Sequence, residues 1–553
     1  MAEIVLSCAY GSKHTPFVHT FICSVLENCS TAQIVIGYSN FPEFELRLLE
    51  VTYPEVIFTQ VDMTAKTFST HAANASKKTH IWRELLEHHV SYGDSAIFLD
   101  IDTIMLDSPF EVFNGSEDIF VTRKSGKWPL NTGVIFVKKT PATLEFFHNW
   151  HGKTETIIGS RNLNQEAEKK SGGADQHSLM EILQIQETIR DTTKQEAFCS
   201  RFALQIKFLN CSQYNETESV PFTDNLRIIH FKAGWHKILL SESKYTKNRP
   251  AKTSAEFHKI WKGYYSKSKF RMHKTLYERA WLEKEIISTI TDLQYEDRGI
   301  YNSELVLICS LMKLSELNNI FESGRARGHS TYVLSEFLKD QVNSKVVSVD
   351  FERNIDTDFS EGRLAPYTKT KLRYGHANVL LKEIVETEIP KDLGYAVLLD
   401  GPKSINAIYL AARLIRSRHC PSIIFIHDMR RYEGGEKPSF HRFLCQTLFD
   451  RVFFSDDFEI SPEVFSADRS VFIQKESGRH NSNEPYVKNF LPTGSYGPTL
   501  AVILPSQRDK KVLRRFLFWP FANAIDSSKQ LIRFLVQGHL FRIASFLGRK
   551  QSP

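Results

Sequence analysis

The stretch Ile97-Phe-Leu-Asp-Ile-Asp-Thr-Ile-Met-Leu106 decides the fold of the N-terminal half of this chain. The apolar run Ala96–Leu99 predicts a buried strand, and the carboxylates of Asp100 and Asp102 follow where that strand ends. Because residues two apart in an extended chain point to the same side, the two carboxylates converge. Oxygen ligands of this kind suit Mg²⁺ or Mn²⁺, which keep coordination positions open for phosphates. The pattern predicts a site for a metal and a diphosphate; a solvated acidic pair is the alternative.

The segments before this strand alternate between strand-like and helix-like patterns. Strands are predicted over 3–8, 33–38 and 56–61, and helices over 17–26 and 77–89. Such an alternation predicts a parallel sheet with helical crossovers, and hence the α/β fold class.

Three further motifs follow the D-x-D pair in order. They are Asn131-Thr-Gly-Val-Ile-Phe-Val137, Gly173-Ala-Asp-Gln-His-Ser178 and Arg227-Ile-Ile-His-Phe-Lys-Ala-Gly-Trp235. With the D-x-D pair they resemble the glycosyltransferases of GT-A fold, the glycogenin-like branch in particular, over roughly residues 1–250. The resemblance implies a Rossmann-like domain that transfers a sugar from a nucleotide-sugar donor to a glycan or glycolipid acceptor, with retention of anomeric configuration.

The same resemblance assigns roles to individual residues. Asp100, Asp102 and His230 would bind Mn²⁺ or Mg²⁺, and Asp175 and Gln176 would be catalytic residues that contact donor sugar and acceptor. The residues that would contact the donor nucleotide are Cys8, Tyr10, Arg83, Asn131, Lys232 and Gly234.

The last motif departs from the family pattern. The family closes with H-F-x-G-x-x-K-P-W, whereas Trp235-His-Lys237 stands here without the proline. Lys232 and Lys237 therefore both remain candidates for the phosphate contact. A lysine and a metal are suited to this place because a departing nucleoside diphosphate develops negative charge.

A second signature lies in the C-terminal half, in Ile320-Phe-Glu-Ser-Gly-Arg-Ala-Arg-Gly-His-Ser-Thr331. Gly324 and Gly328 let the backbone turn tightly and approach a ligand at a helix N-terminus. The strand predicted over 345–349 ends in Asp350, where a carboxylate is placed to bind ribose hydroxyls. The pattern predicts a second nucleoside-binding domain of Rossmann-like fold.

The spacing of the glycines separates two families. The fingerprint of NAD-binding domains is G-x-G-x-x-G, whereas this chain has E-x-G-x-x-x-G from Glu322 onwards. With a turn at Gly375-His-Ala377, this resembles the class I methyltransferases that use S-adenosylmethionine; a dehydrogenase is the alternative. The resemblance implies cofactor contacts from Glu322, Gly324, Gly328, Ser330, Asp350, His376 and Asp400.

Two acidic residues, Asp400 and Asp428, end successive predicted strands, and Lys403 follows the first. This arrangement resembles the metal-dependent O-methyltransferases of the catechol type. It implies a metal at the two aspartates and a lysine that takes the hydroxyl proton, which requires a lysine pKa lowered toward neutrality. Met429 stands where that family has asparagine, and a thioether is a poor ligand for Mg²⁺. His427 is the alternative base.

The length of 553 residues exceeds that of one typical domain. We expect a glycosyltransferase domain over 1–255, a helical connector over 256–300, a methyltransferase domain over 301–490 and a basic amphipathic helical tail over 508–553. Eight cysteines without C-x-x-C spacing suggest neither a zinc site nor a disulfide framework.

The tail differs from the rest of the chain in charge. Residues 508–553 carry a net charge of +8, whereas the whole chain carries +6, so the remainder carries −2. Basic residues mixed with Phe, Leu and Trp predict peripheral contact with an anionic membrane, with a helical cap as the alternative. Nothing beyond charge favours nucleic acid as a partner. The N-terminus lacks the pattern of a signal peptide, so we expect a cytoplasmic protein.

Together these patterns predict a bifunctional enzyme of glycan assembly, for example of surface polysaccharide or lipopolysaccharide. One half would transfer a sugar and the other would O-methylate a sugar hydroxyl. The alternative is that only one half is catalytic and the other is a degenerate binding or scaffold domain.

Overall fold

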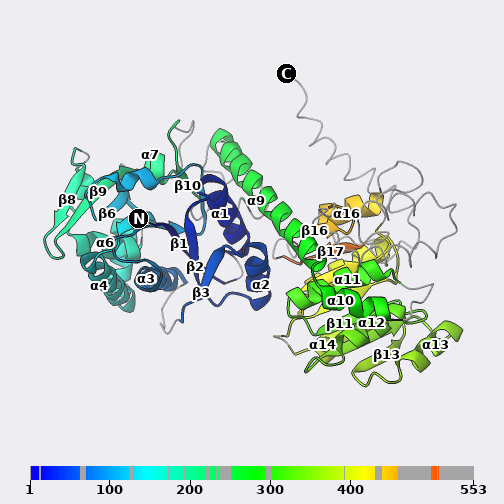
Figure 1. Ribbon diagram of the computed structural model, residues 1–553. Coiled ribbons are helices and arrows are strands. Elements are labelled where there is room, and N and C mark those ends of the chain that lie inside the picture. The colour runs from blue at the N-terminus through cyan, green and yellow to red at the C-terminus, as the bar shows by residue number, and fades with distance from the viewer. Residues whose placement is uncertain are drawn as a thin grey trace. The chain divides into compact units, whose positions relative to one another are not determined.

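The computed structural model (Figure 1) describes residues 2–11, 14–62, 70–124, 129–171, 173–191, 193–217, 224–231, 235, 239, 251–293, 300–390, 393–429, 439–458, 500–506, 509 and 513. The chain forms two compact units, Met1–Thr275 and Leu276–Pro553. The boundary falls inside the stretch 256–300, which holds most of helix α9 (Ala251–Ala280) and all of α10 (Lys284–Asp292). The finer domain limits stay predictions.

The N-terminal unit is built on an eight-stranded sheet with the order β3-β2-β1-β4-β7-β6-β9-β8. The strands are β1 (Glu3–Tyr10), β2 (Gln33–Ser39), β3 (Val56–Gln60), β4 (Ser95–Asp100), β6 (Ile119–Arg123), β7 (Leu130–Lys138), β8 (Glu196–Cys199) and β9 (Leu204–Asn210). β3, β2, β1 and β4 run parallel, whereas β7 is antiparallel to β4 and to β6. The α/β fold class predicted from the sequence is confirmed.

Helices cover both faces of this sheet (Figure 1). They are α1 (Thr15–Asn28), α2 (Glu43–Thr52), α3 (Thr70–His89), α4 (Pro141–Gly159), α5 (Arg161–Ser171), α6 (Ala174–Leu183) and the short α7 (Cys211–Tyr214). Because successive strand residues point to opposite faces, Val5 of β1 packs in one apolar cluster with Phe21 of α1. Leu6 packs in the other, with Trp82 of α3. Helix α3 is therefore fixed on one face of the central strands.

A two-stranded sheet completes the unit. β5 (Thr103–Met105) pairs antiparallel with β10 (Ile228–His230), and His230 lies opposite Thr103. The backbone N–H of Phe231 donates to the carbonyl of Asp102 at 2.8 Å, which extends the pairing by one residue. This small sheet brings the I-I-H motif to the end of the D-x-D strand.

The C-terminal unit contains a seven-stranded sheet with the order β13-β12-β11-β14-β15-β17-β16. Its strands are β11 (Asn319–Ser323), β12 (Lys345–Asp350), β13 (Thr370–Tyr374), β14 (Ala396–Leu399), β15 (Ile423–Ile426), β16 (Val452–Phe454) and β17 (Ala501–Ile503). The first five strands in the order are parallel, and β17 is antiparallel to both of its neighbours. The helices are α11 (Asn302–Leu314), α12 (His329–Leu338), α13 (Ile355–Leu364), α14 (Ala377–Glu388), α15 (Ile405–Arg416) and α16 (Phe440–Leu448).

The basic tail predicted over 508–553 lies outside the described residues, apart from Asp509 and Leu513. Within the part of the chain that the structure describes, no helix combines the length and the apolar character that crossing a bilayer requires.

The first residue of α12 makes the stability of the C-terminal unit depend on pH. His329 is 1% exposed, and its Nε2 lies 2.8 Å from Oδ1 of Asn302. Burial, together with the charge of Arg363, lowers the pKa of His329 to about 3. An unfolded histidine has a pKa of about 6.5, so between these two values the unfolded chain binds a proton that the folded chain does not. Stability is therefore lost as the pH falls through this window.

We expect this residue to lower the free energy of unfolding by about 2 kcal/mol between pH 7 and pH 5. Urea unfolding of the full chain at the two pH values measures the change. His329→Gln keeps a donor for Asn302 and should remove this part of the pH dependence, whereas His88→Gln, at an exposed position, should not. A variant H329Q with the pH dependence of the natural chain would contradict the assignment.

Candidate functional site

Three predicted metal ligands converge in the N-terminal unit. The Nε2 atom of His230 lies 3.2 Å from Oδ1 of Asp102 and 3.5 Å from Oδ2 of Asp100. One ligand atom from each residue lies within 4.8 Å of the others. Two carboxylate oxygens and one imidazole nitrogen fit a hard divalent cation such as Mn²⁺ or Mg²⁺ and leave positions open for phosphate oxygens. The donor set therefore fits the metal that the sequence predicts.

Gly133, in the N-T-G motif of β7, makes room for this group. A Cβ atom at this position would lie 2.1 Å from Cε1 of His230, 2.3 Å from its Nδ1 and 3.1 Å from Oδ2 of Asp100. Any side chain at 133 would therefore push the imidazole out of its place. The glycine is required because His230 and Asp100 pack against it, and the sequence pattern alone does not show this packing.

Lys78 lies beside these ligands, although it belongs to none of the motifs found in the sequence. From helix α3 its Nζ reaches to 2.8 Å from Oδ1 of Asp100 and 3.5 Å from Oδ2 of Asp175. The lysine is 6% exposed, and its Nζ lies 4.6 Å from the ring centre of Trp82. Burial alone lowers the pKa of the ammonium, but Asp100 and Asp175 outweigh it, so the pKa is raised. The sequence did hold one sign that Lys78 is buried. It lies four residues before Trp82, so the two side chains share one face of the helix.

Three other predicted residues, Asp175, Gln176 and Asn131, lie on α6 and β7. Asp175 lies in the first turn of α6, where it accepts a hydrogen bond from Thr132 Oγ1 at 2.6 Å. Gln176 follows it in the same turn. Asn131 accepts from the backbone N–H of Gly133 at 3.1 Å, and its Nδ2 is buried without a hydrogen-bond partner. A buried donor without a partner is costly, so Nδ2 is suited to a ligand oxygen.

Of the other residues predicted to contact the nucleotide, two lie on β1, one lies on α3 and two lie outside the described residues. Cys8 lies opposite Asp100 in the pairing of β1 with β4, and burial, helped by Asp100, raises the pKa of its thiol. Burial also raises the pKa of Tyr10 at the end of β1. Arg83 lies on α3, where it pairs with Glu84 and contacts Nδ1 of His80 at 3.1 Å. The predicted residues Lys232 and Gly234, like Lys237, lie outside the described residues.

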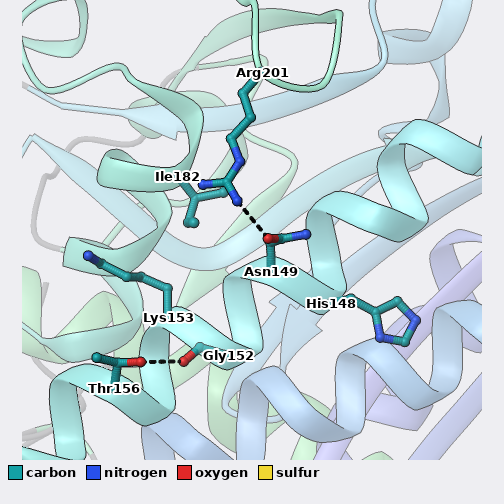
Figure 2. Close-up of a pocket in the computed structure, with 7 residues that line it drawn as sticks. All are labelled: His148, Asn149, Gly152, Lys153, Thr156, Ile182 and Arg201. Carbon is teal, nitrogen blue, oxygen red and sulfur yellow. Dashed lines mark hydrogen bonds between the residues drawn. The ribbon is translucent and has the colours of Figure 1, made fainter.

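Figure 2 shows a pocket of about 410 Å³ on α4, lined by His148, Asn149, Gly152, Lys153, Thr156, Ile182 and Arg201. None of the predicted site residues lines it. Arg201 donates to Oδ1 of Asn149 at 2.8 Å, and Lys153 pairs with Glu181 at 2.8 Å. Because its charged groups are already paired with neighbours, we do not assign this pocket a ligand.

In the C-terminal unit, the glycine segment forms a tight loop between β11 and α12. Gly324 has φ +87° and lies so close to the next strand end that a Cβ atom would be 2.6 Å from the backbone nitrogen of Gly401. Gly328, with φ +77°, precedes the helix. Oδ2 of Asp350 accepts hydrogen bonds from the N–H groups of Arg325 at 2.9 Å and Ala326 at 2.8 Å. Asp350 therefore closes the loop as well as ending β12.

Two of the predicted cofactor contacts lie in the interior instead. Glu322 is 0% exposed, and its carboxylate accepts hydrogen bonds from the hydroxyls of Ser330, Thr331 and Ser348, the last at 2.6 Å. Glu322 and Ser330 thus bind each other and tie β11 to α12. His376 lies at the N-cap of α14, with its ring 5.7 Å from that of Phe351.

The other predicted catalytic residues meet where β14 and β15 end. Lys403 pairs with Asp400, and its Nζ lies 2.8 Å from Oδ2 of Asp428. His427, which is 9% exposed, lies 3.7 Å from Asp428 through Nε2 and 3.8 Å from Oε2 of the buried Glu304 through Nδ1. Glu304 lies in the first turn of α11 and belongs to none of the motifs found in the sequence.

The expected lowering of the Lys403 pKa is wrong for this arrangement. Burial does lower it, but the two carboxylates of Asp400 and Asp428 outweigh burial and raise the pKa. A raised pKa keeps Lys403 charged beside Asp400 and Asp428 in this arrangement. Ligand atoms of Asp400, His427 and Asp428 lie within 4.8 Å of one another, and the ammonium of Lys403 contacts one oxygen of each aspartate. Met429 is buried in the apolar core.

Residues 45–216 match the family model of nucleotide-diphospho-sugar transferases. The match includes Lys78, Asp100, Asp102 and Asp175 and supports a nucleotide-sugar glycosyltransferase function for the N-terminal unit. No curated protein sequence matches the chain.

Several solved structures are similar at low identity. The glycosyltransferase GlyE of Streptococcus pneumoniae TIGR4 is 11% identical, with 75% of this chain and 89% of that chain covered and a TM-score of 0.32. The galactosyltransferase LgtC, in complex with donor and acceptor sugar analogs, is 11% identical, with 47% and 95% covered and a TM-score of 0.29. A putative O-methyltransferase from Klebsiella pneumoniae is 11% identical, with 40% and 89% covered and a TM-score of 0.24. Because the identities and TM-scores are this low, these similarities carry no argument about function, which has to be argued from the residues of the site.

We expect Gly133→Ala to weaken Mn²⁺ binding by about 10–100-fold, because the added methyl group displaces the ring of His230. Titration of Mn²⁺ followed by electron paramagnetic resonance of the free ion measures this. Gly152→Ala is the matched control, since a Cβ atom there meets nothing within 4 Å. Equal Mn²⁺ affinity in G133A and the natural chain would show that the ring does not take part.

Proposed function

We propose that the N-terminal unit transfers a sugar from a nucleotide-sugar donor, with a divalent cation held by Asp100, Asp102 and His230. The observation that carries this proposal is the convergence of these three side chains beside the buried ammonium of Lys78. The family match over residues 45–216 supports it. When bound, the cation would offset the negative charge that develops on the departing nucleoside diphosphate.

The chain's own residues would supply the rest of the site. The ammonium of Lys78, 2.8 Å from Asp100 and 3.5 Å from Asp175, stays charged and gives a second positive group for the donor. The unpartnered Nδ2 of Asn131 would donate to an oxygen of the donor. Asp175, held by Thr132, would orient the reacting sugar. Low exposure of these groups strengthens their electrostatic effect because water is excluded.

The finer features of the reaction are also proposed. By the glycogenin-like pattern, transfer would retain the anomeric configuration, and the acceptor would be a glycan or glycolipid of surface polysaccharide or lipopolysaccharide synthesis. The net charge of +8 over residues 508–553 would draw the enzyme to the inner face of an anionic membrane, where a lipid-linked acceptor is found.

Asp102→Asn tests the first function. We expect it to lower sugar transfer and sugar-nucleotide hydrolysis by about 10²–10³-fold, because the diphosphate charge is no longer compensated. Release of nucleoside diphosphate from a panel of nucleotide sugars, with and without Mn²⁺, measures the rate. Asp94→Asn, just before the opposite end of the same strand, is the control. Undiminished transfer by D102N, or by the natural chain in excess chelator, would refute the assignment.

For the C-terminal unit we propose S-adenosylmethionine-dependent O-methylation of a sugar hydroxyl. In its sheet, antiparallel β17 lies between β15 and β16, which departs from the 3-2-1-4-5-6 order usual for dinucleotide-binding domains. That departure favours a methyltransferase over a dehydrogenase. The polar groups at the ends of β14 and β15 lie near the glycine loop, since Gly324 contacts Gly401.

His427 is the better placed base for such a reaction. Lys403 is held as an ammonium by two carboxylates, whereas the ring of His427 lies between Asp428 and the buried Glu304. The single positive charge of Lys403 would offset part of the negative charge of the two aspartates, and we assign no step to a metal in this unit. If His427 and Lys403 are both dispensable, the unit serves instead as a binding or scaffold domain, and only the first half is catalytic.

Calorimetry of the full chain tests the cofactor. We expect S-adenosylmethionine or its demethylated product to bind and NAD not to bind. Asp350→Asn should weaken binding by about 1–3 kcal/mol, the usual cost of losing hydrogen bonds to a charged group. Asp340→Asn, at an exposed position after α12, is the control. Binding of NAD without binding of the methyl donor would decide for the dehydrogenase.

A further inference from the structure

Asn215 lies directly behind the imidazole of His230. It follows α7, is 1% exposed, and its Oδ1 lies 3.0 Å from Nδ1 of His230. Neither the D-x-D motif nor the three motifs that follow it include this residue. The contact is on the side of the ring away from the two aspartates, which face Nε2.

The surroundings of Asn215 fix which way its amide points. Its Nδ2 lies 3.3 Å from the carbonyl oxygen of Asn131, which can only accept a hydrogen bond. Nδ2 also lies 2.7 Å from Thr122 Oγ1, and the hydroxyl of Thr122 itself donates to the same carbonyl at 2.9 Å. A reversed amide would place oxygen against oxygen at these positions. The nitrogen therefore faces Thr122 and Asn131, and Oδ1 faces His230.

The amide orientation in turn determines the tautomer of His230. Because Oδ1 of Asn215 only accepts, Nδ1 of the imidazole must carry the proton. In the neutral ring, the lone pair is then on Nε2, directed toward Asp102 at 3.2 Å and Asp100 at 3.5 Å. A lone pair that faces two carboxylates is unfavourable, so either a proton or a metal cation is needed between Nε2 and the carboxylates. The ring is thus prepared to be a metal ligand.

The backbone holds Asn215 at this place. Its N–H donates to the carbonyl of Cys211 at 2.9 Å. The next residue, Glu216, donates to the carbonyl of Ile228 at 3.0 Å and accepts from the N–H of His230 at 2.9 Å. The main-chain hydrogen bonds of Glu216 therefore hold the segment that contains Asn215 beside His230, independently of the side-chain contact.

We propose that Asn215 is a positioning residue that sets the tautomer and ring orientation of His230 for metal binding. The inference rests on the metal-dependent function proposed above and deepens it. Partners of this kind behind a ligating histidine typically contribute 10–100-fold to metal affinity. Asn215 connects the metal ligand of β10 to the N-T-G strand and to Thr122 of β6.

The test measures Mn²⁺ affinity in the full chain by electron paramagnetic resonance of the free ion. Asn215→Leu and the smaller Asn215→Ala both remove the acceptor, and we expect each to weaken Mn²⁺ binding by about 10–100-fold. Asn215→Asp keeps an acceptor for Nδ1 of His230 and should retain most of the Mn²⁺ affinity. It disturbs the contact with the carbonyl of Asn131 at least as much as N215L and N215A do, so it controls for the loss of that contact. Pulsed resonance of the bound ion should show the nitrogen coupling of His230 in the natural chain and in N215D, and a reduced coupling in N215L and N215A.

Three results would overturn the proposal in distinguishable ways. Unchanged Mn²⁺ affinity in N215L or N215A would show that the contact does not serve the metal. Equal loss in N215D and N215A would show that Asn215 only supports the local fold. Failure of the natural chain to bind Mn²⁺ would reject the metal-dependent function itself, and this inference with it.

Discussion

The pairing of β5 with β10 is the contact on which the N-terminal site depends. Asp100 and Asp102 come from one strand end, but His230 is distant in sequence and reaches them only because its strand pairs with the residues after Asp102. The hydrogen bond from Phe231 to the carbonyl of Asp102 aligns the two segments at the ligands themselves. Backbone hydrogen bonds, rather than side-chain attraction, therefore assemble the charges, which like-charge repulsion would otherwise oppose.

Both units place a lysine against carboxylates, with different consequences. Lys78 contacts Oδ1 of Asp100 and leaves Oδ2 near His230, so the ligand group of the first site stays accessible to a cation. Lys403 contacts both carboxylates of its site, one from each strand end. In the first unit the ammonium therefore contacts one of the two aspartates of the His-Asp-Asp group, whereas in the second unit it contacts both.

Local sequence patterns predicted the α/β class, because alternating strand and helix patterns carry that information. The resemblance to the GT-A family selected Asp100, Asp102, His230 and Asp175, and the structure places these residues close together. Lys78 was missed because a lysine on an amphipathic helix is normally solvated, and only the packing of Trp82 reveals which face is buried. Asn215 lies in no motif. The predicted lowering of the Lys403 pKa was wrong in direction. The shift depends on the distances from the ammonium to two carboxylates, and the spacing of these residues along the chain does not give those distances.

The close approach of Gly133 to His230 also couples the two positions in evolution. A side chain at 133 and an imidazole at 230 exclude each other sterically, so neither position can drift alone while the site persists. Once a descendant replaces the histidine with a small residue, the space opens and the glycine is no longer required. We therefore expect no related chain to combine a side chain at 133 with an imidazole at 230, whereas a chain without the imidazole can have either a glycine or a larger residue at 133.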